Sequence, residues 1–196
     1  AGKSFDEFFS TASVNDVEFV VSTLFDYFDT LISTARNIDA TRQILDKLDS
    51  LKEKSSYPKY IEFLRKYVED KRIVVPHTFC HGDLTFANII FHQNRLFFID
   101  FLDCYVDTFL SDLVKLKQDL HHLWAVRNQN VYTNRIHQIY QYIWDKLELR
   151  YESHMSEGFH VLDVMNSLRI EPYLTSDSQR VIPVSYTHLR AHETWS

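Results

Sequence analysis

The chain has 196 residues, of which 45% are hydrophobic, and a formal net charge of −6. A chain of this size can bury one sizeable core, so we expect one domain or a large part of one. Its acidic balance, with no cluster of Lys and Arg among aromatic residues, argues against a nucleic-acid groove, and no apolar run approaches the roughly 20 residues that span a bilayer.

Three amphipathic helices are predicted in the first part of the chain. Apolar side chains three and four residues apart predict helices over 14–36 and 40–54, and Pro58 fits the first turn of a third helix over 58–70. Asn15 and Glu18 have the spacing of a capping box at the start of the first helix.

Short strands are predicted after Arg72. Residues 73–75 form a β-branched run that ends at Pro76, and residues 87–91 and 96–100 predict two strands. His92-Gln93-Asn94-Arg95 between them is predicted to be a four-residue hairpin loop.

Helical periodicity resumes after Asp107. Ser111 or Asp112 is expected to cap a helix that continues to about Leu123, and further helices are predicted over 133–150 and 157–170. The order of helices, hairpin and helices predicts a mostly helical α+β fold.

The two cysteines are Cys80 and Cys104. Two are too few for a disulfide scaffold. Both lie in apolar stretches, so we expect two buried, small hydrophobic side chains in a protein of the reducing cytoplasm.

The stretch from His81 to Asp100 contains an acid, an amide and a second acid at spacings that suit phosphoryl transfer. That reaction needs an acid to orient a hydroxyl and accept its proton, and metal ions to neutralise the phosphate oxygens. Asp83 and Asn88 have the Asp-x4-Asn spacing of a kinase catalytic loop. Asp100, at the end of the next predicted strand, can offer a carboxylate to the same Mg²⁺.

Phe79-Cys80-His81-Gly82-Asp83 through Asn88, followed by Phe98-Ile99-Asp100-Phe101, resembles the aminoglycoside phosphotransferase / choline kinase family. That family has a protein-kinase-like fold. The resemblance implies the C-terminal lobe of such a fold, in which a small β-hairpin carries the catalytic loop. It also implies ATP and Mg²⁺ as cofactors.

The same resemblance implies roles for individual residues. Asp83 would be the catalytic base and His81 an organiser of the loop. Asn88 and Asp100 would bind Mg²⁺ and thereby the nucleotide, and Asp103 is a weaker candidate for the metal. Asp112 resembles an aspartate that braces the catalytic loop from the following helix.

The chain also departs from the family's pattern. Its three glycines do not form a glycine-rich loop, and no strand lysine followed by a helix glutamate is found. We therefore expect residues 1–183 to be a C-terminal lobe whose N-terminal lobe is missing, and these 196 residues alone to lack useful kinase activity. Residues 184–196 resemble a translated sequencing adapter and are expected to be a non-native tail.

The predicted function is a bacterial, cytoplasmic phosphotransferase that acts on the hydroxyl of a small molecule, using a nucleotide. A sugar, an amino sugar, a choline-like alcohol or an aminoglycoside fits equally well. The alternative from another class is a non-catalytic kinase-like scaffold, associated with a cell surface or spore coat. A metal hydrolase built on His81, Asp83 and Asp100 is a third reading, which leaves Asn88 without a role.

Overall fold

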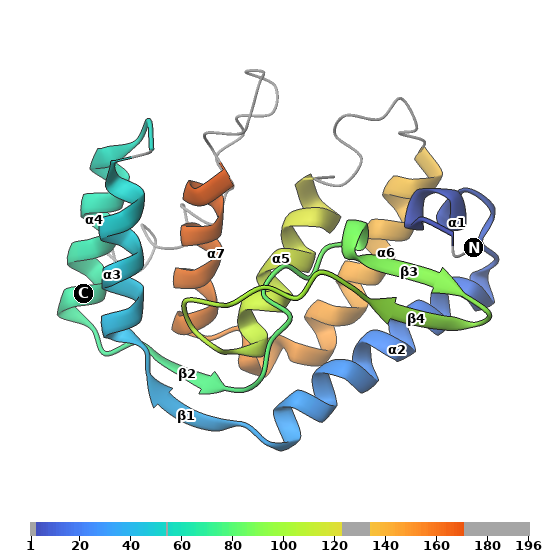
Figure 1. The fold of residues 1–196 in the computed structure, drawn as a ribbon, viewed down its shortest axis with the longest axis horizontal. Helices are drawn as coiled ribbons and strands as arrows, with labels where there is room; N and C mark the ends of the chain where they lie inside the picture. The colour runs from blue at the N-terminus through green and yellow to red at the C-terminus, as the bar shows by residue number, and fades with distance from the viewer. Residues whose placement is uncertain (1–2, 54, 123–133, 171–196) are drawn as a thin grey trace. The chain divides into compact units, whose positions relative to one another are not determined.

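The computed structural model describes residues 3–53, 55–122 and 134–170. Within these residues helices predominate, and short strands form two small two-stranded sheets (Figure 1). The predicted fold class, α+β and mostly helical, is confirmed for the described residues. None of the described helices has the length and apolarity to cross a membrane.

By its internal contacts the chain divides into two compact units. The first comprises residues 1–36 and 76–154, and the second comprises residues 37–75 and 155–196. Residues 184–196, predicted to be a non-native tail, lie outside the described residues.

The first unit is built around three long helices. Its elements are α1 (Phe5–Thr11), α2 (Val14–Ser33), the 3-10 helix η1 (Phe86–Asn88), β3 (Ile89–His92), β4 (Arg95–Phe98), α5 (Phe109–His122), α6 (Asn134–Tyr151) and the 3-10 helix η3 (Glu152–His154). Helices α2, α5 and α6 pack against one another, and α1 contacts α6 and β3. Their shared core contains the fully or almost fully buried side chains of Leu24, Phe28, Phe109, Leu113, Ile143 and Trp144.

Helix α2 begins with a capping box, at a different place from the one predicted. The side chain of Ser13 accepts a hydrogen bond from Asp16 N at 3.2 Å, and the Asp16 carboxylate accepts one from Ser13 N at 2.7 Å. The prediction of Asn15 and Glu18 was wrong because the helix begins at Val14, so the cap is Ser13 and its partner lies three residues on. The hydrogen bond from the Ser13 side chain lowers the pKa of Asp16.

Strands β3 and β4 form the predicted antiparallel hairpin, with a tighter turn. Ile89 pairs with Phe98 and His92 pairs with Arg95, which leaves Gln93 and Asn94 as a two-residue turn. Both turn residues have positive φ, 48° and 54°. A turn of this hand matches the right-handed twist of the strands, which explains why the pairing extends into the predicted four-residue loop.

The second unit contains α3 (Thr41–Lys52), α4 (Pro58–Asp70) and α7 (Glu157–Ile170), and α3 contacts both other helices. All three helices were predicted within a few residues of their observed bounds. The stripes of α3 and α4 are buried as expected, through Ile44, Leu48, Leu51, Ile61, Leu64 and Val68.

One further pair of strands was predicted only in part. Strand β2 (Val74–His77) includes most of the predicted β-branched run, and it pairs with β1 (Arg36–Asp39). Strand β1 was not predicted because its short, mostly exposed sequence has no apolar alternation.

Candidate active site

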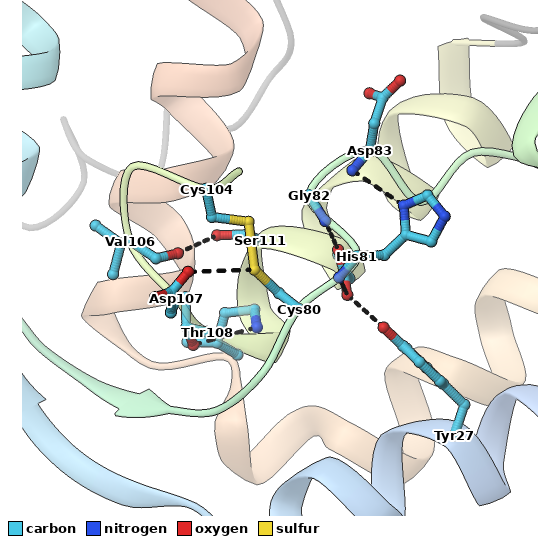
Figure 2. The surroundings of a disulfide bond; sticks show 12 residues. Tyr27, Cys80, His81, Gly82, Asp83, Cys104, Val106, Asp107, Thr108 and Ser111 are labelled. Carbon is cyan, nitrogen blue, oxygen red and sulfur yellow. Dashed lines mark hydrogen bonds between the residues drawn. A yellow bond between two sulfur atoms is a disulfide. The ribbon is translucent and has the colours of Figure 1, made fainter. Parts of the chain in front are cut away.

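The predicted catalytic loop, residues 81–88, lies between β2 and β3. Its first residue, His81, is 0% exposed. The imidazole Nδ1 accepts a hydrogen bond from Asp83 N at 3.3 Å, and the ring stacks on Phe101 with centroids 4.3 Å apart. Figure 2 shows the Asp83 carboxylate directed away from this ring. These contacts give His81 the surroundings of a residue that shapes the loop from within.

Asp112 of α5 holds the start of the loop. Its carboxylate is fully buried and accepts hydrogen bonds from His81 N at 2.7 Å, Gly82 N at 2.9 Å and the Tyr27 hydroxyl at 2.7 Å. Burial raises the pKa of Asp112, and the three hydrogen bonds oppose that rise. All three partners donate, as an ionised carboxylate requires. The brace expected of Asp112 is therefore present.

Gly82 allows the loop to pass close to the segment after β4. Its φ is +84°, a conformation that favours glycine, and a Cβ atom there would collide with the carbonyl group of Leu102. Leu102 N in turn donates to His81 O at 2.9 Å. A side chain at position 82 would therefore separate the loop from that segment.

Asn88 turns its amide toward Asp83. The Asn88 Nδ2 atom donates to the backbone oxygen of Asp83 at 2.8 Å and to its Oδ2 at 3.2 Å. Both side chains are half-buried. The two residues predicted to share the chemistry are thus in direct contact.

Two charged residues of α5 reach the same loop and were not predicted. Lys115 Nζ lies 2.8 Å from Asp83 Oδ1, and an Asp119 oxygen accepts a hydrogen bond from Phe86 N at 2.6 Å. With Asp112 they form a row of buried charges beside the buried apolar side chains of α5. That row was the available signal, because a buried face tolerates charges only where they have partners.

Asp100 lies two residues after the end of β4, between two backbone contacts to the loop. Ile99 N donates to Asn88 O at 3.0 Å, and Leu102 N bonds His81 as described. Asp100 has a φ of +58°. The side chains of Asp100 and Asp103 are both exposed. The chain at Asp100 therefore runs beside both ends of the loop that contains Asp83.

Cys80 and Cys104 form a disulfide that links the same two segments (Figure 2). The expectation of two separate small hydrophobic side chains was wrong, although Cys80 is buried. Residues 24 apart in the chain meet here because Thr78 N donates to Asp107 O at 3.1 Å and brings the segments together.

Potential metal ligands are of two kinds in this region. Ligand atoms of Cys80, Cys104 and Asp107 lie within 4.8 Å of one another, but sulfurs joined in a disulfide are not thiolate ligands. Asp83, Asn88 and Asp100 offer oxygen atoms instead, the ligands that Mg²⁺ prefers.

Comparison with known proteins agrees with these observations. The sequence model of the phosphotransferase enzyme family matches residues 24–150, which include the loop, the hairpin and all of α5. Comparisons with curated proteins and with solved structures give no significant match. Since the matched residues make up more than half of the chain, it belongs to the phosphotransferase enzyme family, in agreement with its resemblance to aminoglycoside phosphotransferases and choline kinases.

Proposed function

We propose that this chain provides the base and the metal ligands of an ATP- and Mg²⁺-dependent phosphotransferase that acts on the hydroxyl group of a small molecule. Residues 81–88 would be the catalytic loop in the C-terminal lobe of a kinase-like fold. The acceptor would be a sugar, an amino sugar, a choline-like alcohol or an aminoglycoside. Membership of the phosphotransferase family supports the reaction class.

The orientation of Asn88 carries the proposal. Its two partners, the backbone oxygen and Oδ2 of Asp83, can only accept hydrogen bonds while the acid is ionised, so the amide nitrogen must face them. The amide oxygen is thereby directed elsewhere. An oxygen held in this way beside an acid is what a metal ligand in a kinase loop requires.

Asn88 and Asp100 would hold the Mg²⁺, and Asp103 is a further candidate. The donor set fits the ion, because Mg²⁺ takes few protein oxygens and completes its shell with waters and phosphates. When bound, the ion would neutralise charge on the phosphate oxygens.

Asp83 would accept the proton of the acceptor hydroxyl, and its surroundings are suited to that role. Asp112 and Asp119 fix the backbone on both sides of it through buried hydrogen bonds. His81 supports the loop from within. A base held in place before the substrate arrives needs little rearrangement during the reaction.

The test uses the complete product of the gene, assayed for phosphoryl transfer to a panel of candidate alcohols. We expect Asp83→Asn to lower kcat by about 100-fold or more, the usual contribution of a general base. Asp46→Asn is the control, because Asp46 is an exposed residue of α3 paired only with Arg42 in the described contacts. An Asp83→Asn variant as active as the control would overturn the proposal.

A second measurement addresses the metal. Nucleotide binding should require Mg²⁺ and should weaken in Asp100→Ala. If wild type and Asp100→Ala bind the nucleotide equally well, Asp100 is not part of the metal site. If the wild type binds the nucleotide but phosphorylates no acceptor, the non-catalytic scaffold is favoured.

We also propose a cytoplasmic location, because the reaction consumes ATP. The Cys80–Cys104 disulfide is the feature that fits this location least, since disulfides of cytosolic proteins are mostly transient or redox-sensing.

A further inference from the structure

A buried lysine contacts the proposed base. Lys115 is 7% exposed as a whole residue, and its Nζ lies 2.8 Å from Asp83 Oδ1. Lysine is among the residues least often buried unless its charge is paired. Asp83 is partly open to solvent, with 31% of its side chain exposed. The ion pair therefore joins a buried cation of α5 to the accessible acid of the loop.

Lys115 lies in a row of three charged residues on α5. Asp112 precedes it by three residues and Asp119 follows it by four, spacings that place all three on one face of a helix. The two aspartates bind backbone N–H groups near the two ends of the loop, as described above. Lys115, between them, binds a side chain. The helix thus holds the loop's backbone with two carboxylates and its acid with one ammonium.

The Asp83 carboxylate is held at both oxygens. Lys115 contacts Oδ1, and the Asn88 amide donates to Oδ2 at 3.2 Å. Two donors from different elements define the orientation of the carboxylate plane. A carboxylate held by only one of them could rotate, and small errors in the placement of a reacting group are costly in rate.

We propose that Lys115 is a positioning residue that holds Asp83 in the orientation in which it accepts the proton of the acceptor hydroxyl. This inference rests on the proposed function of Asp83. The hydroxyl oxygen forms a bond to the γ-phosphorus of ATP while the bond from that phosphorus to the leaving ADP breaks, and the proton of the hydroxyl passes to Asp83. No bond to Lys115 forms or breaks. A purely structural role, in which Lys115 only balances the charges of Asp112 and Asp119, would affect stability without a specific effect on kcat.

The first test replaces Lys115 with methionine in the complete gene product, because methionine has a similar length and no charge. We expect kcat to fall by on the order of 100-fold, with the KM values for nucleotide and acceptor unchanged. Lys117→Met is the matched control, since Lys117 is on the same helix and lies over the Trp144 ring, 5.9 Å from its centroid. An unchanged kcat in Lys115→Met, or an equal fall in Lys117→Met, overturns the inference.

A second test needs no activity. Urea unfolding midpoints of the 196-residue chain are compared for wild type, Lys115→Met, Asp83→Asn and the double variant. If the ion pair couples Lys115 and Asp83, each substitution lowers the unfolding midpoint less in the protein that already carries the other substitution than it does in wild type. Additive shifts contradict the contact on which the inference depends. Should Lys115→Met fail to fold, Lys115→Gln replaces it in both tests with the same expectation.

Together the two tests separate this inference from the proposed function. An active wild type whose kcat does not depend on Lys115 overturns the inference alone. A coupled ion pair in a gene product that phosphorylates no acceptor overturns both, and leaves the pair with a structural role.

Discussion

Charged side chains serve opposite purposes on α5 and on the helix pair α3–α4. On the pair, Arg65 contacts Asp49 at 2.8 Å and also pairs with Glu69, and all three side chains are accessible to solvent. On α5, Asp112 is 0% exposed and each of its hydrogen bonds goes to a group outside its own helix. The charged side chains of α3–α4 lie on the surface, whereas Asp112 of α5 holds the backbone of a loop in place.

The difference shows that burial, not the number of charges, determines what a charged residue does for the fold. Water competes for the exposed pairs and salt screens them, so each contributes little. The donors that Asp112 satisfies are buried or half-buried, and they would lose a partner that water cannot easily replace. The same residue types therefore predict very different effects of substitution.

The largest effect is expected for Asp112→Ala. Removing the carboxylate leaves the N–H groups of His81 and Gly82 and the hydroxyl of Tyr27 without their acceptor, so we expect the free energy of unfolding to fall by about 3 kcal/mol. Urea denaturation of the chain measures it. Asp112→Asn, which keeps one acceptor oxygen, should lose less. If Asp112→Ala lowers the free energy of unfolding no more than Asp46→Ala, a substitution of an exposed aspartate, the distinction between α5 and the pair α3–α4 is wrong.

Reduction of the disulfide should have the next largest effect. The Cys80–Cys104 bond closes a loop over a sequence separation of 24 residues, and reduction should lower the free energy of unfolding by about 3 kcal/mol or somewhat less. Denaturation with and without a reductant measures the difference. The double variant Cys80→Ser/Cys104→Ser should not respond to the reductant. Two free thiols in the oxidised, native protein would show that the bond is absent.

The smallest effect is expected for Arg65→Met. At neutral pH its unfolding midpoint should match that of wild type, because the partners are exposed. The hydrogen bond from Arg65 is the main cause that lowers the pKa of Asp49. An acid whose pKa is lower in the folded state stabilises that state above its unfolded pKa of about 3.9, and the contribution is lost as the pH falls through the folded value.

Any difference in the free energy of unfolding between Arg65→Met and wild type should therefore be largest above about pH 4 and should shrink as the pH falls below that value. High salt should abolish it. Unfolding curves at several pH values and two salt concentrations provide the test. A loss at neutral pH as large as that of Asp112→Ala would mean that exposed pairs also organise the structure.

The sequence by itself was sufficient for the features that depend on neighbouring residues. Helix α4 follows from its apolar stripe and Pro58, and it begins at that proline. The hairpin follows from two apolar runs around polar residues. The spacing of Asp83 and Asn88 was enough to predict their partnership, because a short loop limits how far apart they can lie.

Only the tertiary structure decided which distant residues support that loop. Tyr27 and Asp112 are 85 residues apart and His81 and Asp112 are 31 apart, so their contacts depend on how α2 and α5 pack. Periodicity identified the apolar face of α5 but not the partner of Lys115, because one face of a helix can meet many different neighbours. The cysteine pair was misjudged for the same reason: bonding requires two segments to meet, and that meeting is a property of the folded chain.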